Sequence, residues 1–98
     1  MKTMYVYIMT NTNNTAMYVG VTNDLVRRVW EHKNGILEGF TKKYILHKLV
    51  YFEVYEDEIT AITREKYLKK CYKVTKKKLI SDMNPKWNDL YDTLVPLE

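Results

Sequence analysis

The chain is poor in the residues that break regular structure or cross-link it. Three glycines and two prolines in 98 residues exclude collagen-like, low-complexity and disordered classes. The single cysteine, Cys71, cannot form an internal disulfide, which favours a reducing compartment. No apolar run approaches the roughly 20 residues that span a bilayer, and the first residues alternate like a strand rather than like a signal peptide. We therefore expect one domain over residues 1–98, cytoplasmic, with no membrane partner and no organic cofactor.

Positive charge is moderate in amount but concentrated in one segment. Sixteen basic residues against twelve acidic ones give a formal net charge of +4. Half of the basic residues lie within positions 64–78, beside the single acid Glu65: Arg64, Lys66, Lys69, Lys70, Lys73, Lys76, Lys77 and Lys78. This clustering is typical of a protein that binds a polyanion, although a solvated helix face gives the same pattern.

Three segments have the composition of β-strands. Aromatic and β-branched residues dominate positions 4–9, 16–21 and 48–55. A polar cluster, Asn11-Thr12-Asn13-Asn14-Thr15, separates the first two and predicts an antiparallel hairpin.

Helical patterns fill most of the remaining chain. One runs over residues 22–35, and a second runs over 58–82 with a break near 71–75. The order β-β-α-β-α-α predicts an α+β fold, a small three-stranded antiparallel sheet flanked by helices. Residues from about 91 to 98 are expected to form a frayed tail.

Two polar residues lie beside the apolar face of the first helix. Each residue advances about 100° around a helix, which places His32 on the same side as Leu25 and Val29. Arg28 falls at the edge of that face, one turn from His32, whereas Arg27 points to solvent. The pair indicates either a functional site or a satisfied core histidine beside a solvated arginine.

Glu65 occupies an apolar position of the second helical segment, on the same side as Ala61 and Leu68. A buried carboxylate needs a cation, because burying an unpaired charge is costly. The cation can be a neighbouring Arg or Lys in a salt bridge. It can equally be a hard metal ion such as Mg²⁺ or Mn²⁺, which prefers oxygen ligands.

Two tyrosines of the hairpin are expected to share a face. Side chains alternate along a strand, so Tyr7 and Tyr18 project together if the register aligns them. Gly20 lies beside them and would leave room for a ligand. Ordinary packing of the tyrosines is the alternative.

These residues resemble a known signature. Tyr5-Val6-Tyr7, ten further residues and Tyr18-Val19-Gly20 are similar to the paired motifs of the GIY-YIG nuclease family. Arg28, ten positions after Tyr18, matches the arginine of the family. His32, Glu65 and Asn84 also fall where the family, or its short single-domain bacterial branch of UPF0213 proteins, carries functional residues. The match runs from residue 4 to about 90, and it departs at Tyr5, where the family has glycine.

The resemblance implies a divalent-metal-dependent endonuclease that hydrolyses DNA phosphodiester bonds, structure-selectively or without specificity. In the implied roles, Tyr18 is the general base, Arg28 stabilises the phosphate in the transition state, and Glu65 holds one Mg²⁺ or Mn²⁺ ion. His32 would orient Tyr18 or share a proton relay. Tyr7 would line the site and contact the phosphate or Tyr18.

The basic segment would then contact the nucleic acid. The residues expected to do so are Lys66, Lys69, Lys70, Lys73, Lys76, Lys77 and Asn84. DNA is the expected partner, RNA is left open, and the protein is expected to be a monomer or a weak dimer. Two alternatives are a non-catalytic or partner-dependent nucleic-acid-binding module on the same fold, and a basic nucleic-acid-binding domain unrelated to nucleases.

Overall fold

A computed structural model describes residues 2–36, 39 and 43–95 of the chain. Its strands are β1 (Met4–Thr10), β2 (Met17–Thr22) and β3 (Lys48–Tyr55). They form one antiparallel sheet in the order β2-β1-β3, so β1 is central and β2 and β3 are edges. The expected hairpin and the third strand are confirmed.

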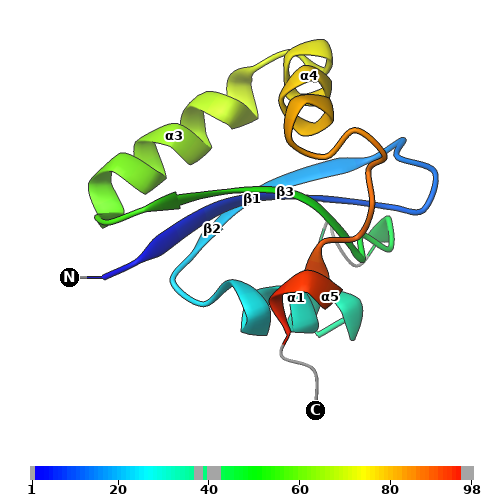
Figure 1. The fold of residues 1–98 in the computed structure, drawn as a ribbon, viewed down its shortest axis with the longest axis horizontal. Helices are drawn as coiled ribbons and strands as arrows, with labels where there is room; N and C mark the ends of the chain where they lie inside the picture. The colour runs from blue at the N-terminus through cyan, green and yellow to red at the C-terminus, as the bar shows by residue number, and fades with distance from the viewer. Residues whose placement is uncertain (1, 37–38, 40–42, 96–98) are drawn as a thin grey trace.

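Helices cover both faces of this sheet. They are α1 (Leu25–Lys33), α3 (Glu58–Lys70), α4 (Lys73–Met83) and α5 (Tyr91–Leu94). Figure 1 shows α3 and α4 on one side of the strands and α1 and α5 on the other. The predicted α+β architecture, a three-stranded antiparallel sheet flanked by helices, is therefore confirmed. No helix in the described ranges is long and apolar enough to cross a membrane.

Side-chain caps set the starts of the two helices that frame the candidate site. Asp24 accepts a hydrogen bond from the backbone N–H of Arg27, and Asp57 accepts one from that of Thr60 at 2.7 Å. Helix α3 ends at Lys70 because the next two residues are extended, with ψ near 150°. The predicted break is confirmed.

The C-terminal segment is more ordered than the sequence indicated. Residues 91–94 form α5, and Asp89 ties this segment to the sheet by accepting the backbone N–H of Leu49 at 3.1 Å and by pairing with Lys33. Leu90 also donates its N–H to the carbonyl of Leu49 at 2.7 Å. The expectation of a frayed tail is therefore wrong for residues 91–94, while 96–98 lie outside the described residues.

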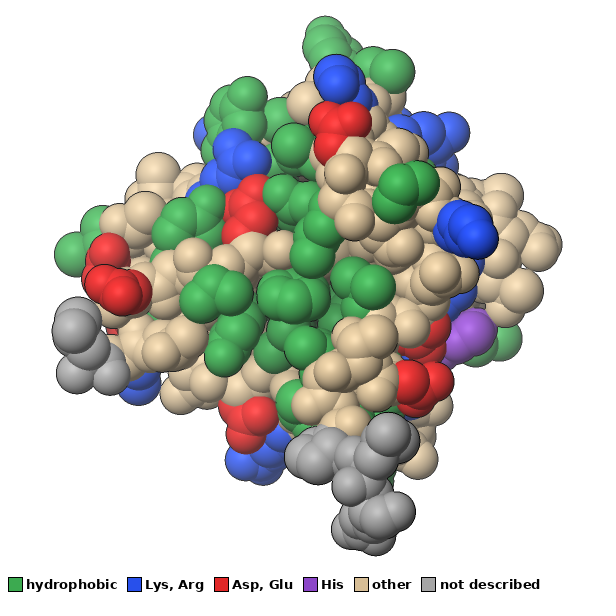
Figure 2. All heavy atoms as spheres, viewed as in Figure 1, with side chains coloured by type: hydrophobic (Ala, Val, Ile, Leu, Met, Phe, Trp, Pro, Cys, Tyr) green, Lys and Arg blue, Asp and Glu red, His purple; other side chains and the backbone are tan. Residues whose placement is uncertain are grey.

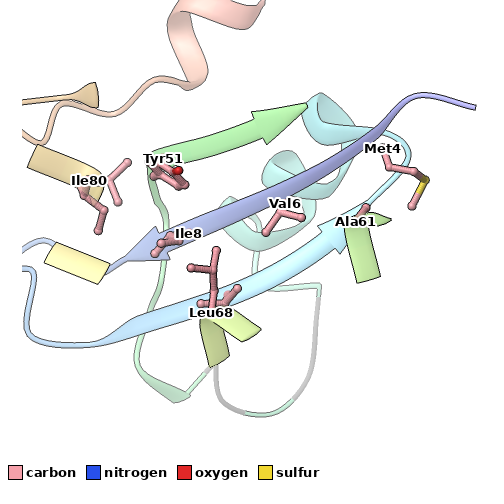
Figure 3. Packing of buried hydrophobic residues seen from close by; sticks show 9 residues of the cluster. Met4, Val6, Ile8, Tyr51, Ala61, Leu68 and Ile80 are labelled. Carbon is pink, nitrogen blue, oxygen red and sulfur yellow. The ribbon is translucent and has the colours of Figure 1, made fainter. Parts of the chain in front are cut away.

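Alternation along β1 divides the interior into two cores. We call them the α3 core and the α1 core, after the helix on each side. The α3 core contains Met4, Val6, Ile8, Val19, Val50, Tyr51, Ala61, Leu68 and Ile80, and Figure 3 shows how these side chains converge. The α1 core contains Tyr7, Met9, Leu25, Val29, Leu46 and Leu49. The polar residues that the sequence predicted to meet, Tyr7, Tyr18 and His32, lie on the side of the α1 core.

The outer surface carries both signs of charge. On the face shown in Figure 2, acidic and basic side chains surround a central group of hydrophobic ones. That face therefore does not present a continuous positive surface to a polyanion.

Candidate active site

Three rings meet between the hairpin and α1. The hydroxyl of Tyr7 and Nε2 of His32 share a hydrogen bond of 2.9 Å. The Tyr18 ring lies 6.2 Å from the Tyr7 ring and 5.5 Å from the His32 ring, centroid to centroid. Tyr7 and His32 are buried, whereas Tyr18 on the edge strand β2 is half-buried. The predicted meeting of Tyr7, Tyr18 and His32 is thus present, with Tyr18 the most accessible of the three.

The space beside Gly20, predicted to admit a ligand, is occupied by a side chain of the protein. Tyr7 and Gly20 are register partners, and a Cβ at Gly20 would lie 2.5 Å from both Cζ and Oη of Tyr7. The space beside Gly20 is therefore filled by the Tyr7 ring and is not free for a ligand. Tyr7 is fully buried and its hydroxyl is bonded to His32, so the predicted contact of Tyr7 with a phosphate or with Tyr18 stays a prediction.

Burial keeps both members of the Tyr7–His32 pair uncharged at neutral pH. It raises the pKa of Tyr7 well above its usual value, and the neighbouring Tyr18 adds to the shift while Arg28 opposes it. Burial, followed by the positive charge of Arg28, lowers the pKa of His32 to about 4, against a smaller opposing effect of Glu31. His32 is therefore a neutral imidazole that can accept a proton as well as donate one.

The second nitrogen of His32 is unusual. Nδ1 is buried and has no hydrogen-bond partner within the described part of the chain. Buried polar atoms are nearly always partnered, so an exception points to a group that is engaged in another state of the protein. A fully satisfied core histidine, the structural alternative for this residue, does not describe His32.

Arg28 is partly exposed and pairs with Glu31, a residue that was not predicted to belong to the site. The Arg28 Nε lies 3.1 Å from a Glu31 carboxylate oxygen, and the Arg27 Nε lies 3.5 Å from the other oxygen. Arg27 is the more exposed arginine, as expected. The spacing of Glu31 from the two arginines, three and four positions, is the signal that could have identified it.

Glu65 is mostly buried, as predicted, and it is paired. Its carboxylate lies 2.9 Å from the ammonium of Lys69, one turn along α3, and its side chain is 12% exposed. The same ammonium lies 5.7 Å from the centroid of the Tyr18 ring. Lys69 therefore connects Glu65 to Tyr18 across the β2 edge, so the carboxylate is near the ring cluster and is not locked in a remote salt bridge.

The donor set suits a metal ion held mainly by waters and substrate. No group of three or more His, Cys, Asp or Glu side chains converges within the described ranges. A Mg²⁺ ion binds through one or two carboxylates and keeps several waters, whereas a closed protein cage needs more ligands. The lone carboxylate of Glu65 fits a Mg²⁺ ion that keeps most of its waters, provided that the Lys69 ammonium moves away from it.

The structure divides the basic residues of positions 64–78. Arg64 and Lys78 form ion pairs with Glu53 and Asp82, and Lys69 belongs to the ring cluster described above. Lys66 and Lys70 are exposed on α3. The others, Lys73, Lys76 and Lys77, lie on α4 around hollows beside the β1–β2 turn.

Asn84 has a structural position. It is 6% exposed, and its amide donates to the carbonyls of Val50 and Asn88 at 3.1 and 2.8 Å. Its side-chain oxygen accepts the backbone N–H of Asn88 at 3.1 Å. These bonds fasten the segment after α4 to β3. The predicted contact of Asn84 with nucleic acid stays a prediction, and the bonds of the enclosed carboxamide do not support it.

A protein-family model and known proteins are similar to this chain in sequence. The GIY-YIG catalytic domain matches residues 3–78. A UPF0213 protein of Clostridium perfringens is 39% identical over 82 residues, covering 84% of this chain and 87% of its own. A UPF0213 protein of Haloquadratum walsbyi is 32% identical, covering 80% and 86%.

A solved structure has a similar fold. The solution NMR structure of the UPF0213 protein BH0048 from Bacillus halodurans superposes with a TM-score of 0.56 at 24% identity, covering 89% of this chain and 92% of that one. The domain match over most of the chain, together with the identity to the clostridial protein, places this chain in the GIY-YIG family, among its UPF0213 members.

Proposed function

We propose that the protein is a metal-dependent endonuclease that hydrolyses DNA phosphodiester bonds at the ring cluster of α1 and the hairpin. Membership of a nuclease domain family supports the reaction class. The observation that carries the proposal is the convergence of an accessible tyrosine, a neutral histidine and a partly exposed arginine beside a mostly buried carboxylate.

Tyr18 is the candidate general base. It is the one ring of the cluster that is not buried, so a water molecule or a phosphate can reach its hydroxyl. The His32 ring packs against it, and His32 is itself held by Tyr7. We therefore assign His32 to positioning Tyr18, and Tyr7 to positioning His32. General bases placed in this way contribute about 10²–10⁴ in rate.

Arg28 is the candidate for stabilising the transition state. A phosphate gains negative charge as the attacking oxygen approaches, and a guanidinium can meet two of its oxygens at once. Arg28 is already held by Glu31, which limits the number of positions that its guanidinium can adopt. Binding of a phosphodiester would compete with Glu31 for the same N–H groups.

Glu65 would hold a Mg²⁺ or Mn²⁺ ion. When bound, such an ion supplies a Lewis acid that neutralises charge on the phosphate and on the leaving oxygen. The contribution of the chain is a carboxylate kept largely out of water and close to Tyr18.

One observation favours a second candidate function, that of a non-catalytic or partner-dependent nucleic-acid-binding module. Lys69 already neutralises Glu65, so the folded chain does not need a metal ion to balance this buried charge. Lys69→Ala separates the two functions. In a nuclease, it removes a competitor of the metal and lowers the Mg²⁺ concentration that gives half-maximal cleavage. In a binding module, it leaves the protein inactive at every metal concentration.

A cleavage panel tests the proposal. Purified protein is incubated with Mg²⁺ or Mn²⁺ and with single-stranded, duplex, flap and branched DNA, and with a matching RNA. We expect DNA cleavage that is abolished by EDTA and by Glu65→Ala, with Glu58→Ala as a control that removes a half-exposed carboxylate from the same helix. Absence of cleavage on every substrate would contradict the proposal.

The cellular setting is also proposed. A single cysteine, half-buried and without a disulfide partner in the described structure, is consistent with a cytoplasmic protein. We propose a monomer or weak dimer, which sedimentation at several protein concentrations would check.

A further inference from the structure

A basic groove lies at the end of the hairpin, away from the ring cluster. It has a volume of about 540 Å³ and is lined by Lys73, Lys77 and Lys86, by the ring of Trp87 and by residues 13–15 of the β1–β2 turn. No acidic side chain of the described residues lines it. Figure 1 shows the segment after α4 passing beside this turn. We call this site the turn groove.

Resting on the proposed function, we infer that the turn groove binds an unpaired DNA strand next to the cleavage point. Two lysines of the groove supply positive charge for such a strand. Lys77 and Lys86 have no ion pair within the described residues, in contrast to Arg64 and Lys78 of the same basic segment. Their ammonium groups are therefore available for phosphate oxygens, the interaction that dominates binding of nucleic acids.

Trp87 indicates the kind of strand. Its indole N–H donates to the Ser81 hydroxyl at 3.0 Å and the residue packs against the α3 core, which restrains the ring, while the half-buried side chain also lines the groove. An aromatic face beside cationic side chains binds an unpaired base by stacking. In a duplex the bases stack on one another, so this feature favours a single strand.

Backbone strain supports a binding role for the same place. Trp87 has φ of +53° and Asn14 has φ of +57°, and both line the groove. A left-handed conformation is unfavourable for a bulky residue such as tryptophan and is commonly kept where a side chain must be aimed. The chain thus holds the indole in the groove at a conformational cost.

The groove continues toward β2, the strand that carries Tyr18. Thr15 and Lys73 line both the turn groove and a neighbouring hollow, which continues along Ala16 and Met17. Met17 precedes Tyr18 on the edge strand. The three residue-to-residue steps from Thr15 to Tyr18 span at most about 11 Å of extended chain, so one strand can contact Trp87 and place a phosphate near Tyr18.

Fluorescence of Trp87 tests the inference without any need for cleavage. The chain has two tryptophans, so Trp30→Phe leaves Trp87 as the sole reporter. Binding is measured in EDTA with an oligothymidylate of about 12 nucleotides, within the usual site size of single-strand binders, and with a blunt duplex of equal length. We expect the oligothymidylate to quench Trp87 and the duplex to leave its emission unchanged. Equal quenching by both, or by neither, would overturn the inference.

Charge variants in the same background provide the matched comparison. Lys77→Gln with Lys86→Gln should weaken binding of the oligothymidylate about tenfold at moderate salt and reduce the slope of log K against log salt by about 1.4, since each phosphate contact contributes about 0.7 for a single strand. Lys2→Gln with Lys78→Gln removes the same charge from ion pairs outside the groove and should change neither. Equal losses of affinity in the two double variants would contradict binding of the strand in the turn groove.

The two proposals fail in different ways. Loss of quenching with intact, metal-dependent cleavage would reject the turn groove and leave the nuclease in place. Quenching without cleavage of any substrate would retain the groove and reject the nuclease.

Discussion

The two faces of the sheet each carry tyrosines beside charged groups, and they differ in how fully those groups are partnered. On the α3 side, Glu53 accepts hydrogen bonds from Tyr51 and Tyr55 and a bidentate contact from Arg64. On the α1 side, His32 leaves a buried nitrogen without a partner in the described structure, and Tyr18 is partly open.

The pKa shifts follow the same division. Burial raises the pKa of Glu53, but hydrogen bonds from Arg64, Tyr51 and Tyr55 outweigh it and hold that pKa below its usual value. The Glu53 cluster thus stabilises its own charge. On the other face, the His32 imidazole is kept neutral by burial and by Arg28. We call a cluster saturated when its polar groups all have hydrogen-bond partners, as around Glu53, and such a cluster stabilises the fold. An unsaturated cluster, such as that around His32, can still bind a ligand or a proton.

The largest expected effect is on the cleavage rate, and it should differ between Tyr18 and Tyr51. We expect Tyr18→Phe to lower the cleavage rate by about 10²–10⁴ because it removes the proposed general base. Tyr51→Phe removes a hydroxyl from the saturated face and should leave the cleavage rate unchanged. Rates on the best substrate of the cleavage panel measure the difference. Similar losses in the two variants would show that the faces are not functionally distinct.

The saturated face should dominate stability. Glu53→Gln leaves the Arg64 charge without its carboxylate, and we expect a loss of about 2–3 kcal/mol in the free energy of unfolding. Glu31→Gln removes the same charge from the open face, where Arg27 is largely exposed, and should cost at most about 1 kcal/mol. Urea denaturation compares them, and a larger loss for Glu31→Gln would reverse our assignment.

Gly20 should be sensitive because of Tyr7. A Cβ at this position would meet the Tyr7 ring, so Gly20→Ala should cost about 2 kcal/mol through overpacking. In a Tyr7→Leu background, which removes the hydroxyl and the ring atoms that the new methyl group would meet, the same change should cost less. Equal costs in the two backgrounds, measured by urea denaturation, would mean that Tyr7 is not what excludes a side chain here.

A pH profile gives the smallest effect. His32 has a lowered pKa in the folded state, so the unfolded chain binds more protons between about pH 6.5 and 4 and stability falls as the pH falls through this range. We expect a loss of about 1 kcal/mol between pH 7 and 5.5. His32→Phe should abolish that part of the slope, while His47 remains in both proteins as an internal control. An unchanged slope would show that His32 is not buried as described.

Sequence periodicity predicted much of this architecture. The third strand was expected at the residues where β3 is found, because aromatic and β-branched residues run without interruption from Val50 to Phe52. Helical geometry distinguished Arg28 from Arg27 and placed His32 against the core. These features are local, so residue spacing alone can indicate them.

Features that depend on contacts between distant segments were not predictable. The enclosure of Tyr7 by Gly20 depends on the hairpin register, and the Tyr7–His32 bond depends on how α1 docks on the sheet. Asn84 was assigned by resemblance, and only its bonds to Val50 and Asn88 reveal its structural role. Trp87 gave no signal in the sequence, because its groove forms only where the last segment meets the β1–β2 turn.

The most direct test of the proposed metal site is paramagnetic broadening by Mn²⁺ in a ¹⁵N-resolved NMR spectrum. We expect substoichiometric Mn²⁺ to broaden the amide signals of Glu65 and Tyr18 more strongly than that of Glu53, and we expect Glu65→Gln to abolish the effect while Glu53→Gln does not. Stronger broadening at Glu53 than at Glu65, or none at Glu65 and Tyr18, would contradict the assignment of the metal-binding site to Glu65 beside Tyr18 at the β2 edge.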